Sequence, residues 1–211
     1  MPIPPAASIA HVARTAVLAI LLTASLPMNA ATEPDFATDG AAWQVVNDGV
    51  MGGVSSSRVE ADANGVRFSG VVRTGNNGGF ASARRAVDAG RVNRDVDAFL
   101  LRVRGDGHRY RFRAYVRGPD GGLQGYSYYA EFATSAEAET EHRLPLAQFR
   151  ASFRGRAVPE APPLAWRDVA GVGLMLLKDG HRDGRGPFAL TLLSLLTVPS
   201  GAPEPPIRPG R

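Results

Sequence analysis

Short β-rich runs separated by turn-forming residues are the feature that most limits how this chain can fold. Apolar and polar residues alternate within the runs, which is the pattern of a half-buried strand. The joints contain pairs such as Asn64-Gly65, Asp106-Gly107 and Asp179-Gly180, which favour turns. The predicted strands are Gly65–Val72, Phe80–Val87, Ala98–Arg104, Tyr110–Arg117, Tyr126–Ala133, Glu141–Leu146, Val169–Lys178 and Pro187–Val198.

The pattern of a long amphipathic helix is missing beyond the first 31 residues, and only Leu144–Phe153 has room for one short helical turn. About eight to ten short strands with turn-rich joints predict an all-β fold, a β-sandwich of the jelly-roll kind. We expect the sandwich to cover residues 43–198, with Trp43 beginning the ordered part. A short polar lead-in at 32–42 precedes it, and a proline- and glycine-rich tail at 199–211 is expected to be disordered.

Residues 1–31 are typical of a secretory signal peptide. Arg14 precedes the apolar run Ala16–Leu22, and small residues follow at Ala30 and Ala31, where we expect cleavage. The run is shorter than the roughly 20 apolar residues that span a bilayer, so no stable membrane span is expected after cleavage. An uncleaved amino-terminal anchor is the alternative. The expected location is therefore the periplasm or the outside of the cell.

Composition excludes several kinds of chemistry. Cysteine is absent, which excludes disulfides, thiolate metal sites and a cysteine nucleophile, although export does not require disulfides. The formal net charge is +4, and Lys178 is the only lysine among the basic residues. This excess of arginine over lysine indicates a bias in the amino-acid usage of the source genome more than a surface for nucleic acid. No nucleic-acid partner is therefore expected.

Arginines concentrate in Leu100–Arg117, which we expect to form a β-hairpin around the turn Gly105–His108. Alternation with apolar residues would place the arginines of both strands on one sheet face. Like charges on one face call for compensating carboxylates such as Glu131 on a neighbouring strand. The face is either a solvated outer surface or a basic concave surface for an acidic ligand or partner. The arginines concerned are Arg102, Arg104, Arg109, Arg111 and Arg113.

No catalytic or metal-binding motif stands out. His108, His142 and His181 lie in or beside predicted turns without metal-ligand spacing, so we interpret them as surface histidines and predict no metal. The glycines around Val50 lack the lysine and helix of a phosphate loop, and there is no G-x-S-x-G elbow. Asp48 with Asp106 or Asp179 is the remaining enzymatic option, and turn formation explains these aspartates as well. We predict a non-catalytic protein without a cofactor.

Two loops rich in glycine and asparagine, Val46–Ser57 and Thr74–Phe80, are the predicted binding region, and we expect the first to dock against residues 76–84. Their side chains offer donors and acceptors suited to a sugar hydroxyl or a peptide amide. Alternatively, the asparagines and glycines only adopt positive-φ turns and the nearby aromatic residues belong to the core. Apolar platforms are expected from Trp43, Met51, Phe80 or Trp166. The predicted ligand-binding residues are Asn47, Asp48, Met51, Asn76, Asn77 and Arg84.

These loops carry the resemblance of the chain to a known family. The matching segments are Trp43 with Val46–Ser57 (VNDGVMGGVSSS), Phe68–Gly70, Asn76–Arg84 (NNGGFASAR), Asp106-Gly107 with Tyr110, Tyr126–Phe132, Leu144–Leu146 with Phe149, Arg154-Gly155, Val172–Leu177 and Gly186–Phe188. Over Trp43–Val198 the sequence resembles the complex I intermediate-associated protein 30 domain family, whose fold is similar to galactose-binding jelly rolls. The resemblance implies this fold, shared with carbohydrate-binding modules, and a role like that of non-catalytic assembly chaperones of respiratory complex I.

Two functions follow as expectations. The first is a protein-interaction module, similar to an assembly factor, with a protein partner in an envelope complex. The alternative is a carbohydrate-binding module of the periplasm or cell surface, with a glycan as its ligand.

Overall fold

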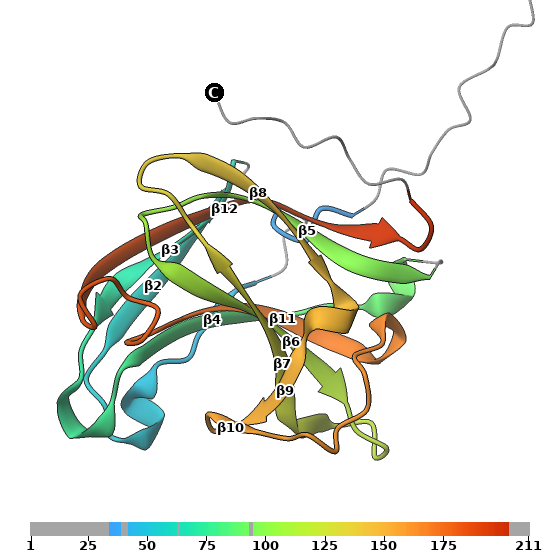
Figure 1. The fold of residues 1–211 in the computed structure, drawn as a ribbon, viewed down its shortest axis with the longest axis horizontal. Helices are drawn as coiled ribbons and strands as arrows, with labels where there is room; N and C mark the ends of the chain where they lie inside the picture. Colours follow the sequence, from blue (N-terminus) through green and yellow to red (C-terminus); the bar gives the residue numbers. More distant parts are fainter. Residues whose placement is uncertain (1–33, 39–41, 63, 93–94, 203–211) are drawn as a thin grey trace, which may run out of the picture. The chain divides into compact units, whose positions relative to one another are not determined.

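The computed structural model describes residues 34–38, 42–62, 64–92 and 95–202, all of which belong to the compact unit Thr32–Arg211. The predicted signal peptide and the tail from residue 203 lie outside the described residues. Figure 1 shows the described part as two β-sheets packed face to face, and every strand pair in both sheets is antiparallel. The prediction of an all-β sandwich is confirmed.

The two sheets contain twelve strands between them. In spatial order, the seven-stranded sheet holds β1 (Gln44–Val45), β4 (Phe80–Ala86), β11 (Val169–Leu177), β6 (Arg109–Arg117), β7 (Leu123–Ala133), β9 (Arg150–Phe153) and β10 (Arg156–Ala157). The five-stranded sheet holds β2 (Ser56–Asp62), β3 (Gly65–Val72), β12 (Gly186–Pro199), β5 (Val96–Arg104) and β8 (Glu139–Pro145). Short 3₁₀ turns join them at Asp48–Met51, Gly75–Asn77, Ala89–Arg91, Leu146–Gln148 and Trp166–Asp168.

All eight predicted strands are present, with ends shifted by three residues at most. The strands that were not in the predicted set are β1, β2, β9 and β10, and two of these are only two residues long. Such short strands carry too few residues to show an alternating pattern.

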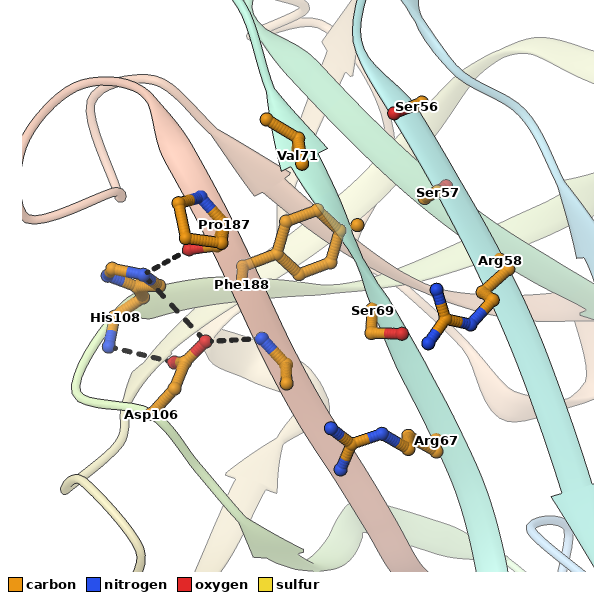
Figure 2. A pocket seen from close by; sticks show the side chains of 12 residues that line it. Ser56, Ser57, Arg58, Arg67, Ser69, Val71, Asp106, His108, Pro187 and Phe188 are labelled. Carbon is orange, nitrogen blue, oxygen red and sulfur yellow. Dashed lines mark hydrogen bonds and ion pairs between the residues drawn. The ribbon is translucent and has the colours of Figure 1, made fainter.

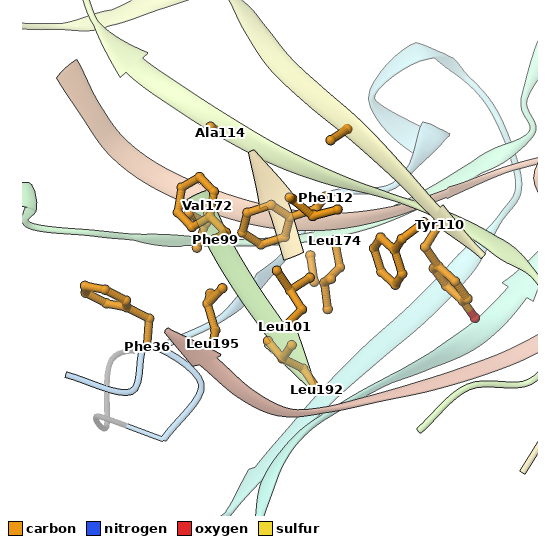
Figure 3. Close-up of a cluster of buried hydrophobic side chains, with 14 of the residues drawn as sticks. Phe36, Phe99, Leu101, Tyr110, Phe112, Ala114, Val172, Leu174, Leu192 and Leu195 are labelled. Carbon is orange, nitrogen blue, oxygen red and sulfur yellow. The ribbon is translucent and has the colours of Figure 1, made fainter. Parts of the chain in front are cut away.

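The core lies between the sheets, where alternate residues of facing strands meet (Figure 3). Phe99 on β5 packs edge-on against Phe112 on β6, with ring centroids 4.9 Å apart. Leu174 on β11 and Leu192 on β12 are fully buried between the same two layers. Burial of each such side chain stabilises the fold by roughly 1.5–3 kcal/mol.

The lead-in contributes to this core, although we expected ordered structure to begin only at Trp43. Phe36 is 1% exposed and packs against Trp166, with ring centroids 6.0 Å apart. Its backbone N–H donates to the carbonyl of Leu195, 2.9 Å away. Trp166 is buried by these contacts, so it belongs to the core and does not offer an exposed platform.

The predicted hairpin over Leu100–Arg117 is wrong, because its two strands lie in different sheets. β5 pairs with β12 and β8, whereas β6 pairs with β11 and β7. The turn Gly105–His108 therefore arches from one sheet to the other. Both strands still turn their apolar residues toward the same core, but their arginines point to opposite outer surfaces of the sandwich. Alternation alone does not distinguish a hairpin from such an arch, since the period of two is the same in both.

Candidate functional site

The candidate site is a groove of about 780 Å³ on the outer face of the seven-stranded sheet. It crosses the strands from β4 to β9, and the two predicted loops lie at its β4 end. Its lining is Val46, Val50, Met51, Asn77, Gly78, Gly79, Phe80, Ser82, Arg84, Arg111, Arg113, Tyr115, Gly125, Tyr129, Ser152, Phe153, Arg154, Gly155, Met175, Leu177, Lys178 and Asp179.

Two glycines of β11 make room for the floor of the groove. A Cβ atom at Gly173 would lie 2.7 Å from the carbonyl oxygen of Ala83 and 3.2 Å from the ring of Tyr115. At Gly171 a Cβ atom would lie 2.8 Å from the carbonyl oxygen of Arg85 and in ordinary contact, at 3.6 Å, with the same ring. Glycine is thus required where Tyr115 lies across β11. The small outward residues of this strand keep the middle of the sheet face shallow.

Arginine and tyrosine side chains stack on one another along the floor. The guanidinium carbon of Arg111 lies 4.4 Å from the ring centroid of Tyr129, and that of Arg113 lies 5.1 Å from Tyr115. Arg113 also donates hydrogen bonds to the hydroxyl of Ser127 and, at 3.8 Å, to the sulfur of Met175. These contacts hold the positive charges in place at the surface of the sheet.

The groove has more cations than carboxylates. Arg111 pairs with Glu131 at 2.9 Å and with Asp179 at 3.8 Å, which confirms the expectation that Glu131 compensates an arginine of this strand. No carboxylate of the described residues lies within ion-pair distance of the other four cations that line the groove. These four are Arg84, Arg113, Arg154 and Lys178.

Asp48 joins the two loops at the rim. Its carboxylate accepts hydrogen bonds from the backbone N–H of Ser55, Gly79 and Phe80 and from the Ser55 hydroxyl, at 2.6–3.3 Å. Burial by itself raises the pKa of Asp48, but these hydrogen bonds outweigh it and hold the pKa below its ordinary value. Glycine is required close by, because a Cβ atom at Gly53 would lie 2.4 Å from the carboxylate carbon. The loops therefore dock against each other, as expected, through a buried charge.

The structure divides the six predicted ligand-binding residues into two groups. Met51, Asn77 and Arg84 line the groove, where all three are exposed. The other three hold the loops: Asp48 is 0% exposed, Asn47 accepts from the Ser57 hydroxyl, and Asn76 donates to the carbonyl of Gly52. Asn76 and Asn77 also have positive φ angles of 53° and 58°, so the turn role foreseen for the asparagines is present too.

Sequence reasoning missed the aromatic residues of the groove. Tyr115, Tyr129 and Phe153 lie on β6, β7 and β9, far from the two loops in sequence. The only signal for the first two was their place on the polar side of alternating strands. Phe153 is 45% exposed and belongs to a strand that was not predicted.

A second hollow, of about 700 Å³, lies on the five-stranded sheet (Figure 2). Arg58 on β2 and Arg67 on β3 flank Ser69, whose buried hydroxyl has no hydrogen-bond partner. Asp106 and His108 of the arch line the other side.

The arch is held by Asp106, and it buries two histidines that we had interpreted as surface residues. The Asp106 carboxylate accepts from the Tyr110 hydroxyl at 2.8 Å and from the backbone N–H of Ala189 at 2.7 Å. His108 and His181 stack with ring centroids 4.0 Å apart and are 7% and 5% exposed. The surface assignment was wrong for both, because the arch brings the two turns together over β12.

Each ring of this pair accepts a backbone hydrogen bond at Nδ1, from Arg182 for His108 and from Asp183 for His181, both at 3.1 Å. Acceptance at Nδ1 requires the neutral form with the proton on Nε2. Burial lowers the pKa of His108, and the nearby Asp106 only partly opposes this effect. Burial and the hydrogen bond at Nδ1 both favour the neutral form of His108.

The described residues contain neither a membrane-spanning helix nor a cluster of metal ligands. No helix among them is both long and apolar enough to cross a membrane. Within the same ranges, no three histidine or carboxylate side chains gather as metal ligands would.

The matched family agrees with the resemblance seen in the two loops. The sequence profile of complex I intermediate-associated protein 30 matches residues 32–192. The chain belongs to this family. Its match covers both rim loops and every strand of the groove, so the groove is built within the region that defines the complex I intermediate-associated protein 30 family. No curated protein matches the sequence significantly.

Solved structures place this family member among jelly-roll folds. The family 11 carbohydrate-binding module of the cellulosomal cellulase Lic26A-Cel5E of Clostridium thermocellum superposes with a TM-score of 0.56 at 11% identity, over 80% of this chain and 96% of the module. A family 11 module from the same organism, solved with a β-1,3-1,4-mixed-linked tetrasaccharide, gives a TM-score of 0.51 at 12% identity, over 74% and 89%. At these identities the similarity establishes the fold.

Proposed function

We propose that the protein is a non-catalytic binding domain that takes a saccharide chain in the groove of the seven-stranded sheet. The observation that carries the proposal is the groove itself. It crosses five adjacent strands and combines stacked tyrosines with arginine, asparagine and serine side chains. At a strand spacing of about 4.8 Å, five strands extend over about 19 Å, which suits several linked sugar rings. Aromatic faces with a few directed polar groups are the usual lining of a ligand site.

Two further observations support a role in binding over a role in catalysis. Asp48 and Asp106 are occupied by hydrogen bonds that hold the fold, so neither is available as a catalytic acid or base. The fold is also that of a module solved with a bound tetrasaccharide. We further propose that the protein is exported, on the basis of the signal-like residues 1–31, and that the described domain meets its ligand outside the cytoplasm.

Affinity electrophoresis of the full-length protein in gels that contain soluble polysaccharides tests this function. We expect retardation by at least one polysaccharide and about tenfold weaker binding for Tyr129→Ala and Phe153→Ala. Leu123→Ala is the matched control, because Leu123 is a 58% exposed apolar residue that does not line the groove. A folded protein that no polysaccharide retards would exclude the proposal.

The second candidate function is docking of a protein partner at the first loop, in the manner that the family name suggests. Val50, Met51 and Val54 are 73%, 58% and 45% exposed, and together they form an apolar patch at the rim. Val54 does not line the groove, so Val54→Ser separates the two candidates. Loss of co-purified partners in Val54→Ser, with saccharide binding retained, would assign the loop to a protein and the groove to a glycan.

A further inference from the structure

The four unpaired cations follow the direction of the groove. Arg84 lies on β4, Arg113 on β6, and Arg154 directly after β9. In the sheet order β4-β11-β6-β7-β9 these positions are two strands apart each time. Arg84 and Arg113 both stand opposite Gly173 and are about 10 Å apart across the strands. Arg154 lies further along the groove, four residues beyond Arg150, the residue of β9 in line with Arg113. Lys178, at the end of β11, adds a fourth charge beside the groove.

The arginines are exposed toward the groove with donor groups to spare. The side chain of Arg84 has no hydrogen bond or ion pair with another described residue, and Arg84 stands opposite Gly173 in the strand register. Arg113 stands opposite Gly173 from the other side, so the two arginines flank the glycine across which the Tyr115 ring lies. A guanidinium presents paired N–H donors that match the two oxygens of a carboxylate.

From this arrangement we propose that the groove selects an acidic polysaccharide, one whose sugar rings carry carboxylates, over a neutral one. This inference rests on the proposed function and names its ligand class. Recurrent charges along a groove match a polymer with repeated carboxylates better than a single small anion. The tyrosines supply flat faces for the rings between these charges.

An acidic polypeptide fits the same groove less well. Peptides bind β-sheets most readily by adding a strand to an open edge, where backbone groups are unpaired. The groove instead crosses the face of the sheet, over strands whose backbone groups are already paired with their neighbours. A peptide lying there would find no unpaired strand for its backbone N–H and C=O groups. A saccharide chain has no peptide backbone, so it can lie across the strands without leaving such groups unpaired.

Isothermal titration of the full-length protein with galacturonate or mannuronate oligosaccharides, and with their methyl esters, tests the inference. The esters keep the sugar backbone and remove the charge. We expect at least about tenfold tighter binding of the acids than of the esters, and weaker binding at about 300 mM than at about 50 mM NaCl. Arg84→Gln and Arg113→Gln should each reduce acid binding about tenfold and change ester binding little.

Arg102→Gln is the matched control, since it makes the same charge change on the outer face of the other sheet. Arg84 is exposed and holds no partner, so its variant tests the groove without disturbing the fold. Equal binding of acids and esters, lost in Tyr129→Ala, would overturn the acidic specificity and leave the proposed function standing. Binding of poly-glutamate as tight as that of the acidic saccharide would also overturn it. A folded protein that binds no saccharide at all would exclude both the acidic specificity and the proposed function.

Discussion

The two outer faces of the sandwich both carry arginines, but the residues that stand opposite these arginines differ between the faces. On the five-stranded sheet three of the five arginines stand opposite a glutamate in the register: Arg67 and Glu60, Arg102 and Glu141, Arg104 and Glu139. The other two, Arg58 and Arg143, form ion pairs with Glu60 and Asp97. On the seven-stranded sheet only Arg111 stands opposite a glutamate, Glu131. Arg84 and Arg113 both stand opposite Gly173.

This difference separates a face whose arginines are paired from the face that we propose as the binding surface. Cross-strand pairs of opposite charge neutralise one another and leave little field for a ligand. Unpaired guanidinium groups beside tyrosines leave both charge and donor groups available. The arginine-rich segment is therefore divided between the two faces: the arginines of β5 lie on the paired, solvated face, and those of β6 lie at the groove for which we propose binding.

The largest effect is expected at the rim of the groove. Asp48→Ala removes the acceptor of one buried and two partly buried backbone N–H groups and should lower the free energy of unfolding by about 3 kcal/mol. Urea denaturation measures it, and saccharide binding should weaken as well because the loops separate. Asp62→Ala, which loses one exposed turn hydrogen bond, is the control and should stay within about 0.5 kcal/mol. Equal losses of stability in the two variants would contradict the role of Asp48 in holding the two loops together.

The corresponding carboxylate on the other side is Asp106. Asp106→Ala removes the acceptor of the Ala189 N–H and the Tyr110 hydroxyl and should cost about 2 kcal/mol. Because these hydrogen bonds of Asp106 lie on the five-stranded side, the saccharide affinity of the folded protein should be unchanged. An affinity loss as large as that of Tyr129→Ala would break the distinction between the two faces.

Acid should act on the buried His108 and the half-buried His142. Burial lowers the pKa of His108 and of His142 in the folded state, so the unfolded chain binds protons first as the pH falls below about 6.5. Stability is therefore full above that pH and decreases below it. Thermal melts at about pH 7.5 and about pH 5.5 should show a lower Tm at the acidic pH. The difference should shrink in a His108→Asn, His142→Asn double variant. An unchanged difference would assign the acid sensitivity to other groups.

The smallest effects concern the surface charges themselves. Glu139→Gln breaks the exposed pair with Arg104, whose atoms lie 2.6 Å apart, and should cost no more than about 0.5 kcal/mol. Arg84→Gln removes an unpaired charge from a positive face and should leave stability equal or slightly higher. The urea denaturation midpoints of the two variants, compared in one buffer, measure both effects. A clear loss in Arg84→Gln would mean that this arginine serves the fold and not a ligand.

Much of the fold was accessible from local pattern. Alternation located the eight main strands, and the glycine-rich composition of Val46–Ser57 and Thr74–Phe80 indicated shaped loops that meet. The composition of these loops also led to the prediction of Met51, Asn77 and Arg84, which line the groove. The same pattern misjudged Asp48, whose burial depends on amides from a segment 31 and 32 residues away. It likewise misjudged His108 and His181, which meet only because the arch crosses between sheets.

The sequence by itself determined which residues face inward and which face outward, because that choice follows from the period of two along each strand. Only the tertiary structure decided which outward faces are shared. Strand pairing depends on contacts between distant segments, so the separation of β5 from β6 has no local signal. That separation leaves the arginines of β6 among tyrosines and glycines instead of glutamates, and so creates the groove.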